Sequence, residues 1–410
     1  MPGEDLFLSD AGSLRRGRFT YFPVVPGRLE FAHEVRRAIL REPPQVVALE
    51  LPVALQECYL RAIERLPQIS VIFYSDQRDE ENAVYVPVEP ADAFTEAIRT
   101  GRETGAEIVF ADPDSGERPH LPDAYPDTFS IQTIGLTKYV EAYRLFPQPR
   151  SEAIERHAGG IAWKLQGTDP LARVLVVISL NLLDPVLDAM ERPQAQPMTR
   201  RRRGIQLLNP HPESLAEITV EYPYLQHRYE ESRYEESRAM VNRLAVQSAV
   251  FREAEKLYET NAGERVAHWQ RRLLARYSRR LAVAGQELAA SLFDLTVAAR
   301  SIVDDNYAWE VWETAGRYPF QKIAGDIPTV KISGGEVWLG TRKIRLRRRI
   351  PSKKRRLRPI GLKPRKKEER PGQWASELNG DHICSYPPED LVIEDYGRYL
   401  KKKGKSILSQ

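Results

Sequence analysis

Residues 18–52 read RFTYFPVVPGRLEFAHEVRRAILREPPQVVALELP, and this stretch decides the fold. Its first part, 19–25, is β-branched and aromatic and stops at a Pro-Gly pair, which predicts a buried strand ending in a turn. Apolar residues then recur at helical spacing over 29–40, until a Pro-Pro pair ends the helix. Residues 46–49 are continuously apolar, as in a strand covered on both faces of a parallel sheet. The stretch therefore predicts a βαβ unit.

Glu50 stands where the second of these strands ends. In open α/β sheets the carboxyl ends of the strands face the ligand crevice, so Glu50 is the first candidate for chemistry. A structural role is an equal alternative. A carboxylate just before Pro52 can accept backbone N–H groups from the first turn of the next helix, which otherwise have no partner.

The same pattern of strands and helices continues as far as residue 212. We expect further strands at 69–74, 83–88, 106–110, 174–180 and 205–208, and helices at 53–66, 91–104, 132–145 and 151–165. The predicted fold class is α/β, with a mostly parallel sheet and helices on both faces. We assign residues 1–212 to this domain.

Two further groups of polar residues fall at informative places. Asp112 and Asp114 follow the strand at 106–110, where a solvated Asp-Pro turn is favoured over a binding site. Ser151 is a candidate N-cap, and the helix after it carries Arg156 and His157. For His157, a place on the helix surface is favoured over a functional one.

Four segments together resemble a known superfamily. They are PGRLEFA at 26–32, PQVVALELP at 44–52, ERHAGGIAWKL at 155–165 and VLVVISLN at 174–181. In this order they resemble the erythromycin-esterase-like, TraB/Tiki-like and ChaN-like proteins. The resemblance covers the first half of the chain and implies a hydrolase scaffold.

The resemblance implies four site residues, of which this chain matches two. Glu50 matches the expected glutamate and Arg156 the expected arginine on the late helix. The expected histidines after the first and last strands are replaced by valine, proline, leucine and asparagine, which cannot shuttle a proton at neutral pH. His33 lies two turns inside the first helix and is predicted to be a surface residue. The resemblance thus implies a degenerate active site.

Residues 213–318 lose the strand pattern and are predicted to be helical. The segment 228–238 repeats Glu and Arg closely enough to pair along a helix, which is typical of a solvated face. Two apolar stripes, over 240–257 and 266–295, are predicted to face each other as a hairpin that turns at 261–263. For the acidic pair at 304–305, charge at a helix N-terminus is favoured over cation binding.

Residues 319–410 form a third, basic segment. Short alternating stretches with glycine turns predict β-hairpins up to residue 349, and the following proline-interrupted run is predicted to be disordered or extended. Between residues 341 and 367 there are 15 Lys or Arg and no Asp or Glu. The net charge of the whole chain is only +4, so the rest of the chain is acidic.

This basic segment is the candidate binding surface for an anionic partner. Its candidate binding residues are Arg345, Arg347, Arg348, Arg349, Lys353, Lys354, Arg355 and Arg356. Because no aromatic residue is interleaved for base stacking, we expect only salt-sensitive contact with the nucleic-acid backbone. An anionic membrane would be held weakly. Docking onto an acidic partner protein, or onto the acidic body of the same chain, is the alternative.

Composition limits the cellular setting. The two cysteines, Cys58 and Cys384, lack the spacing of a zinc site or a disulfide framework, which favours a reducing cytoplasm. The N-terminus lacks the apolar core of a signal peptide, and the longest apolar run, 174–183, is too short to span a bilayer. We therefore expect a cytoplasmic protein without a transmembrane segment.

Two functions follow from these observations. The favoured one is an interaction module, in which a degenerate α/β domain and helical hairpin carry a polyanion- or partner-binding basic segment. The alternative is a divergent hydrolase that uses Glu50 as base and Arg156 to stabilise an oxyanion. A divalent metal cofactor enters only under this alternative.

Overall fold

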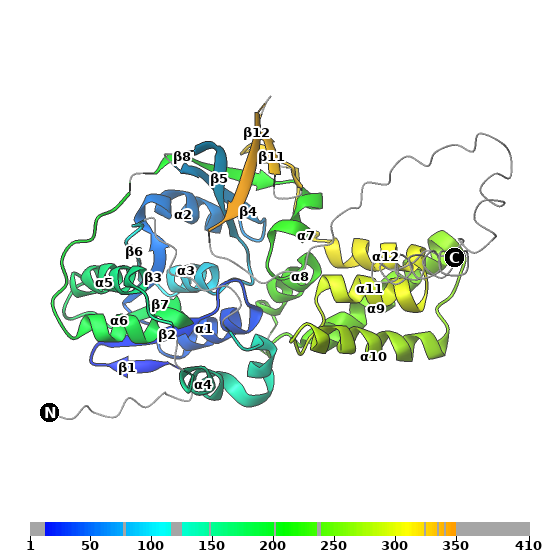
Figure 1. Cartoon of the computed structure of the whole chain (residues 1–410), viewed down its shortest axis with the longest axis horizontal. Helices are drawn as coiled ribbons and strands as arrows, with labels where there is room; N and C mark the ends of the chain where they lie inside the picture. Colours follow the sequence, from blue (N-terminus) through cyan, green and yellow to red (C-terminus); the bar gives the residue numbers. More distant parts are fainter. Residues whose placement is uncertain are drawn as a thin grey trace, which may run out of the picture.

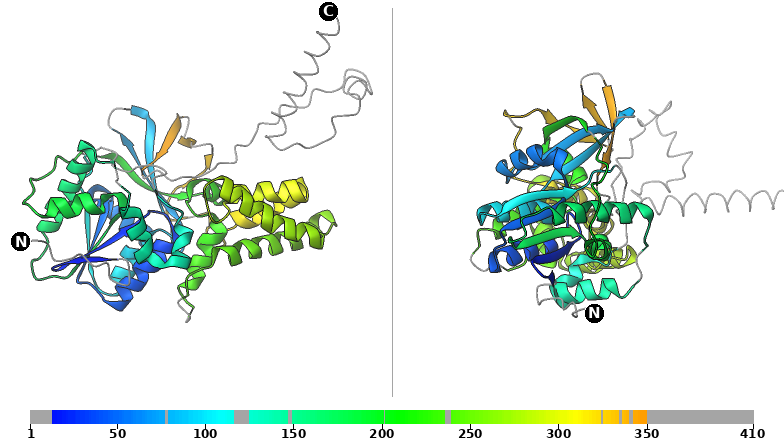
Figure 2. Two further views of the ribbon diagram at one scale, coloured as in Figure 1. Left: turned by 60° about the horizontal axis from the view of Figure 1, so that its bottom comes forward. Right: turned by 90° about the vertical axis from the view of Figure 1, so that its left-hand side faces the viewer.

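The computed structural model describes residues 13–349 except 77–78, 116–124, 147–148, 201, 236–238, 324, 334–335 and 340–341. It is an α/β body from which a group of helices projects to one side (Figures 1 and 2). Within the described residues, the strands form two sheets. The expected continuation beyond residue 349 lies outside the described residues.

The first sheet contains the predicted βαβ unit. Its five strands lie in the order β1-β2-β7-β3-β6, and all neighbours are parallel except β1 and β2. The strands are β1 Leu14–Arg16, β2 Phe19–Val24, β3 Val46–Pro52, β6 Glu107–Asp112 and β7 Val174–Ser179. The apolar runs read from the sequence are therefore strands of a mainly parallel sheet, with β7 inserted between β2 and β3.

Helices cover both faces of this sheet (Figure 1). Helix α1 packs on α3, and α5 packs on α6. The bounds are α1 Leu29–Arg41, α3 Ala93–Glu103, α4 Ile131–Arg144, α5 Glu152–Gln166 and α6 Leu183–Met190. Ser151 caps α5 by accepting a hydrogen bond from the backbone N–H of Ile154, as the sequence predicts.

The second sheet is mixed and was not predicted as a separate sheet. Its order is β10-β11-β12-β5-β4-β8-β9. The strands are β4 Ser70–Asp76, β5 Asp79–Val88, β8 Arg203–Pro210, β9 Thr329–Val330, β10 Ile332–Ser333, β11 Glu336–Leu339 and β12 Arg342–Arg348. The expectation that β4 and β5 extend the parallel sheet is wrong, because the short connection between them makes an antiparallel hairpin.

The late strand β12 pairs in parallel with β5, so the C-terminal hairpin completes the second sheet. The backbone N–H of Arg349 extends this pairing by donating to the carbonyl of Tyr85 at 3.0 Å. Four short helices complete the body: α2 Gln56–Glu64, α7 Leu215–Ile218, and the 3-10 helices Val53–Leu55 and Leu180–Leu182. Two more 3-10 turns are Thr128–Ser130 and Pro212–Ser214.

The remaining helices form a bundle with a different pairing from the predicted hairpin. They are α8 Pro223–Ser232, α9 Arg243–Ala262, α10 His268–Ala284, α11 Leu292–Ile302 and α12 Asp305–Gly316. Helix α9 packs mainly on α12, and α10 on α11. The apolar stripe over 266–295 is broken, because the chain turns at Gly285 and Ser291 then caps a new helix. Asp304 caps α12 through the N–H of Tyr307, in agreement with the favoured role.

Helix α1 contributes to two of the three hydrophobic cores among the described residues. Phe31 and Val35 pack in the core around the sheets, whereas Leu29 and Ala32 pack in the core of the bundle. Helix α1 therefore joins the two parts of the molecule. None of the described helices is long and apolar enough to cross a bilayer.

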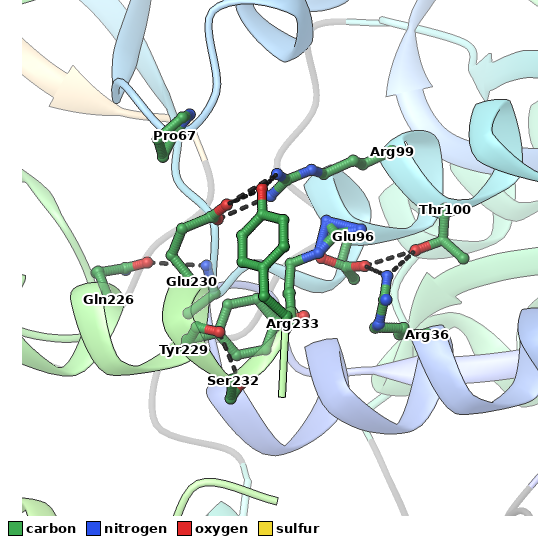
Figure 3. A network of polar contacts seen from close by, with 12 residues as sticks. Arg36, Pro67, Glu96, Arg99, Thr100, Gln226, Tyr229, Glu230, Ser232 and Arg233 are labelled. Carbon is green, nitrogen blue, oxygen red and sulfur yellow. Dashed lines mark hydrogen bonds and ion pairs between the residues drawn. The ribbon is translucent and has the colours of Figure 1, made fainter. Parts of the chain in front are cut away.

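Buried ion pairs also join the body to the bundle. Arg99 donates to both carboxylate oxygens of Glu230, at 2.7 and 2.8 Å, and Arg233 pairs with Glu96 (Figure 3). Helix α8 ends at Ser232, and Glu230 is fully buried. The prediction that this charged repeat is a solvated face is therefore wrong for Glu230 and Arg233, because both find partners on α3.

Candidate acid-base site at the carboxyl ends of the parallel strands

Glu50 lies at the carboxyl end of β3, where the sequence places it, and is only 1% exposed. Its Oε2 accepts a hydrogen bond of 2.7 Å from the backbone N–H of Ser179. That donor is at the end of the adjacent strand β7, not in the helix that follows β3. The structural alternative expected a backbone donor in the following helix, and this backbone donor comes instead from β7, which pairs with β3 in the sheet.

His157 is the residue of α5 that reaches Glu50. Its Nε2 lies 3.6 Å from Glu50 Oε1, and its side chain is buried. A place on the helix surface is therefore wrong for His157. A Cβ on Gly160 would lie 2.6 Å from Pro113, so this glycine allows α5 to approach the turn after β6 closely. Close packing brings the imidazole to the ends of β3 and β6.

Arg156 does not join this site. Its side chain is half exposed and pairs with Glu152 one turn earlier on the same helix. Successive residues of an α-helix point about 100° apart, so only one of Arg156 and His157 can face the sheet. Of these two neighbours, the structure brings His157 to Glu50 and leaves Arg156 half exposed. His33 is also not a plain surface residue, since it packs against the ring of Tyr229 in the bundle.

Asp112 and Asp114 are buried, so a solvated turn is wrong for both. Asp112 accepts a hydrogen bond from Arg349, and its other oxygen accepts one of 2.7 Å from the backbone N–H of Asp114. Asp114 is bound by Arg202 through two hydrogen bonds, at 2.7 and 2.8 Å, and by Arg349 at 3.2 Å. Arg349 also donates to the hydroxyl of Tyr74 at 2.9 Å. These contacts bring the C-terminal arginine to the carboxyl end of β6.

Part of the predicted basic surface is therefore used in ion pairs with carboxylates of the same chain. Arg348 donates to Glu89 at 2.7 Å and to the carbonyl of Ile218 at 2.9 Å. Arg345 is exposed and Arg347 is half-buried. The remaining candidates, Lys353, Lys354, Arg355 and Arg356, lie outside the described residues. For Arg348 and Arg349, docking onto the acidic body of the same chain is the alternative that holds.

Tyr125 and Asn181 also belong to the group of residues around Glu50. They were not predicted as site residues from the sequence. The Tyr125 hydroxyl donates to the Asn181 side-chain oxygen at 2.7 Å, and its ring stacks on Tyr143. Burial, together with Tyr143 and the Glu50 carboxylate, raises the pKa of Tyr125 well above its usual value. Tyr125 comes from a proline-rich loop that gave no local signal for a function.

The surroundings of His157 raise its pKa. Burial on its own lowers the pKa of His157, but the nearby Asp112 and Glu50 carboxylates outweigh it and hold that pKa above the ordinary value of 6.5. Burial would also raise the pKa of Asp114, but Arg202 and Arg349 outweigh it and hold that pKa below its usual range. The site therefore holds an imidazole that binds its proton more tightly than usual, beside the buried Glu50 and Asp112 side chains. No group of three or more metal-ligand side chains gathers among the described residues.

We expect the raised pKa of His157 to make stability depend on pH. Since the folded state holds this proton more tightly, the contribution is complete below the unfolded pKa of about 6.5 and is lost as pH rises through the folded pKa. Over that range the free energy of unfolding should fall by at most about 1.4 kcal/mol per pH unit for this one proton. Urea unfolding of wild type and His157→Gln between about pH 6 and pH 9 measures the effect. Identical pH profiles would contradict it.

No protein-family model, curated protein or solved structure matches the chain. The superfamily resemblance therefore stays a prediction, and function is argued from the site alone.

Proposed function

We propose that the protein is a hydrolase whose acid-base pair is Glu50 and His157. The observation that supports this most is the 3.6 Å approach of His157 Nε2 to Glu50 Oε1 at the carboxyl ends of the parallel strands. A carboxylate can accept a proton from an attacking water, and an imidazolium can donate one to a leaving group. The raised pKa of His157 suits the donor role, because this imidazole keeps its proton to a higher pH than an ordinary histidine does.

Arg349 takes the role that the sequence gave to Arg156. Its guanidinium binds Asp112, and its charge lowers the pKa of His157 against the larger effect of the carboxylates. A positive group held in a buried site can stabilise negative charge that develops on a substrate oxygen. Under this proposal Arg349 is the electrostatic group, and Asp112 positions it.

The resemblance points to ester substrates, so the assay uses a nitrophenyl ester, a lactone and an anilide, with and without divalent metals. We expect Glu50→Gln and His157→Asn to lower kcat/KM by about 100-fold, which is typical for loss of an acid-base group. Glutamine keeps an oxygen for the Ser179 N–H, so Glu50→Gln should fold.

Arg156→Ala is the matched control for this assay. It alters the neighbouring residue on the same helix, whose side chain is half exposed and pairs with Glu152. We expect it to retain wild-type activity. Equal activity of Glu50→Gln and wild type would remove Glu50 from the mechanism. Absence of turnover with every substrate and metal in the panel would contradict the hydrolase proposal. The interaction module would then be the favoured function.

We also propose that the basic segment 341–367 binds polyanions, with an acidic partner protein as the alternative ligand. The supporting observation is the exposure of Arg345 on β12, within a segment that carries 15 basic residues and no acidic ones. Because Arg348 and Arg349 bind carboxylates of the same chain, only Arg345 and the residues after 349 are assigned to the polyanion.

Filter binding of RNA and DNA oligomers at rising salt tests this second proposal. We expect replacement of Lys353, Lys354, Arg355 and Arg356 by alanine to reduce the slope of log K against log salt by about 3 to 4 for duplex DNA. This change leaves β12 in place, so the fold is kept. Binding without a salt slope, or unchanged in the variant, would contradict the electrostatic account.

A further inference from the structure

A cavity of about 650 Å³ lies between α1 and the C-terminal end of α8. Its volume is in the range of small-molecule sites. Its lining residues are His33, Arg36, Arg37, Leu40, Arg41, Tyr229, Ser232, Arg233 and Glu235. Figure 3 shows part of this lining from close by, with Arg36 and Arg233 on either side of Glu96. The cavity is separate from the site that contains Glu50.

The inner part of the cavity is aromatic and uncharged. The rings of His33 and Tyr229 meet edge to face with centroids 4.8 Å apart. His33 Nε2 accepts a hydrogen bond of 3.2 Å from the backbone N–H of Val241. Burial lowers the pKa of His33 to about 4, so the imidazole is neutral at physiological pH. Tyr229 is fully buried, so the partly exposed imidazole of His33 is the ring surface that this region offers to a ligand.

Two arginines of the cavity lining, Arg36 and Arg233, bind carboxylates of α3. Arg233 donates to both oxygens of Glu103, at 2.7 and 2.8 Å, and to Glu96 at 3.3 Å. Arg36 reaches Glu96, Glu103 and Thr100 through Nη1 alone, each at 3.4 Å. Its Nη2 and Nε make no hydrogen bond to the described residues. Arg36 is thus held in place by weak contacts and keeps donors for a ligand.

The rim adds two arginines from the same helix. Arg37 donates to Glu34 at 2.9 Å, and its side chain is 55% exposed. Arg41 has no ion-pair partner among the described residues. At about 100° per residue, positions 36, 37 and 41 fall within an arc of about 140° on α1. Three guanidinium groups therefore border one side of the cavity, and Glu235 is the single carboxylate among the described residues of the lining.

We propose that this cavity binds a small phosphate-bearing molecule. The planar fork of arginine matches phosphate oxygens, and several converging arginines match a phosphate better than a singly charged carboxylate. The volume exceeds that of one phosphate group, so it also accommodates an organic part against the imidazole of His33. The proposal does not depend on the hydrolase function.

Isothermal titration of the full chain with pyrophosphate, AMP and ATP tests the proposal, with succinate as the carboxylate comparison. We expect saturable binding of at least one phosphate compound, and at least about tenfold weaker binding in the double variant Arg37→Gln/Arg41→Gln. Both side chains are exposed, so this variant should fold. Hydrogen exchange should show ligand protection over residues 33–41 and 229–235.

Two controls separate the cavity from other basic surfaces. Arg102→Gln alters an exposed arginine of α3 that pairs with Glu64 outside the cavity, and should leave affinity unchanged. Alanine at Lys353, Lys354, Arg355 and Arg356 should also leave it unchanged. The proposal is overturned by absence of saturable binding, by equal affinity of Arg37→Gln/Arg41→Gln and wild type, by tighter binding of succinate, or by binding lost only in the alanine variant.

Discussion

Replacing Arg243 with methionine is expected to lower the free energy of unfolding by about 3–5 kcal/mol, the cost of leaving buried charges without their partner. Arg243 sits between two buried carboxylates, one on α1 and one just before α8. It donates to Glu30 at 2.5 and 2.8 Å and to Glu221 at 2.7 Å. Both glutamates are almost fully inaccessible to solvent, so water cannot replace the guanidinium.

The acid side of the stability profile should change as well. Burial would raise the pKa of Glu30, but Arg243 outweighs it and lowers that pKa to about 2 from 4.5. A lowered pKa gives stability that is present above the unfolded value and lost as pH falls through the folded value. In wild type this loss falls between about pH 4.5 and pH 2, and Arg243→Met should abolish it.

Chemical unfolding of Arg243→Met measures the effect, with Arg102→Met as the control. The pair of Arg102 and Glu64 is exposed on both sides, and exposed pairs contribute little. Adding Glu30→Gln and Glu221→Gln removes the orphaned charges and should restore much of the lost stability. Equal stability of the Arg243 and Arg102 variants would show that the buried cluster does not hold α1 to α8 and α9.

Replacing Arg349 with glutamine is expected to cost about 3 kcal/mol, because the buried Asp112 then loses its guanidinium partner. Asp114 keeps Arg202, so the loss falls mainly on one carboxylate. The change also acts on the candidate acid-base pair. The positive charge of Arg349 opposes the raised pKa of His157, so its removal should raise that pKa further.

Urea unfolding and NMR titration of the His157 imidazole measure the two effects of Arg349→Gln. Arg345→Gln is the matched control, since Arg345 lies on the same strand but is exposed. We expect this control to match wild type in both measurements. A His157 titration that does not move in Arg349→Gln would show that the arginine is too far from the imidazole to influence catalysis.

Local pattern in the sequence was enough to predict the elements of the first sheet. Residues 46–49 are continuously apolar because β3 is covered on both faces, and Glu50 follows directly, so its place at the strand end could be predicted. The cap at Ser151 was equally local. Such features depend on residues that are close together in the sequence, so the sequence alone is enough to predict them.

Features that depend on tertiary packing could not be predicted in the same way. Arg156 and His157 are adjacent, and the choice between them is made by the close contact of Gly160 with Pro113. The apolar stripes of the bundle predicted which face of each helix is buried. They did not predict which other helix packs against that face. Arg348 and Arg349 look like part of a solvated basic run, because their carboxylate partners are far away in the sequence.

That separation has a consequence for synthesis of the chain. Glu89 is made 259 residues before Arg348, and Asp112 is made 237 residues before Arg349. Until those arginines leave the ribosome, the nascent body has acidic side chains at positions that the native fold buries, and no counterion for them. The body can therefore complete its folding only after translation has passed residue 349, and a chain that terminates earlier is an expected target for quality control.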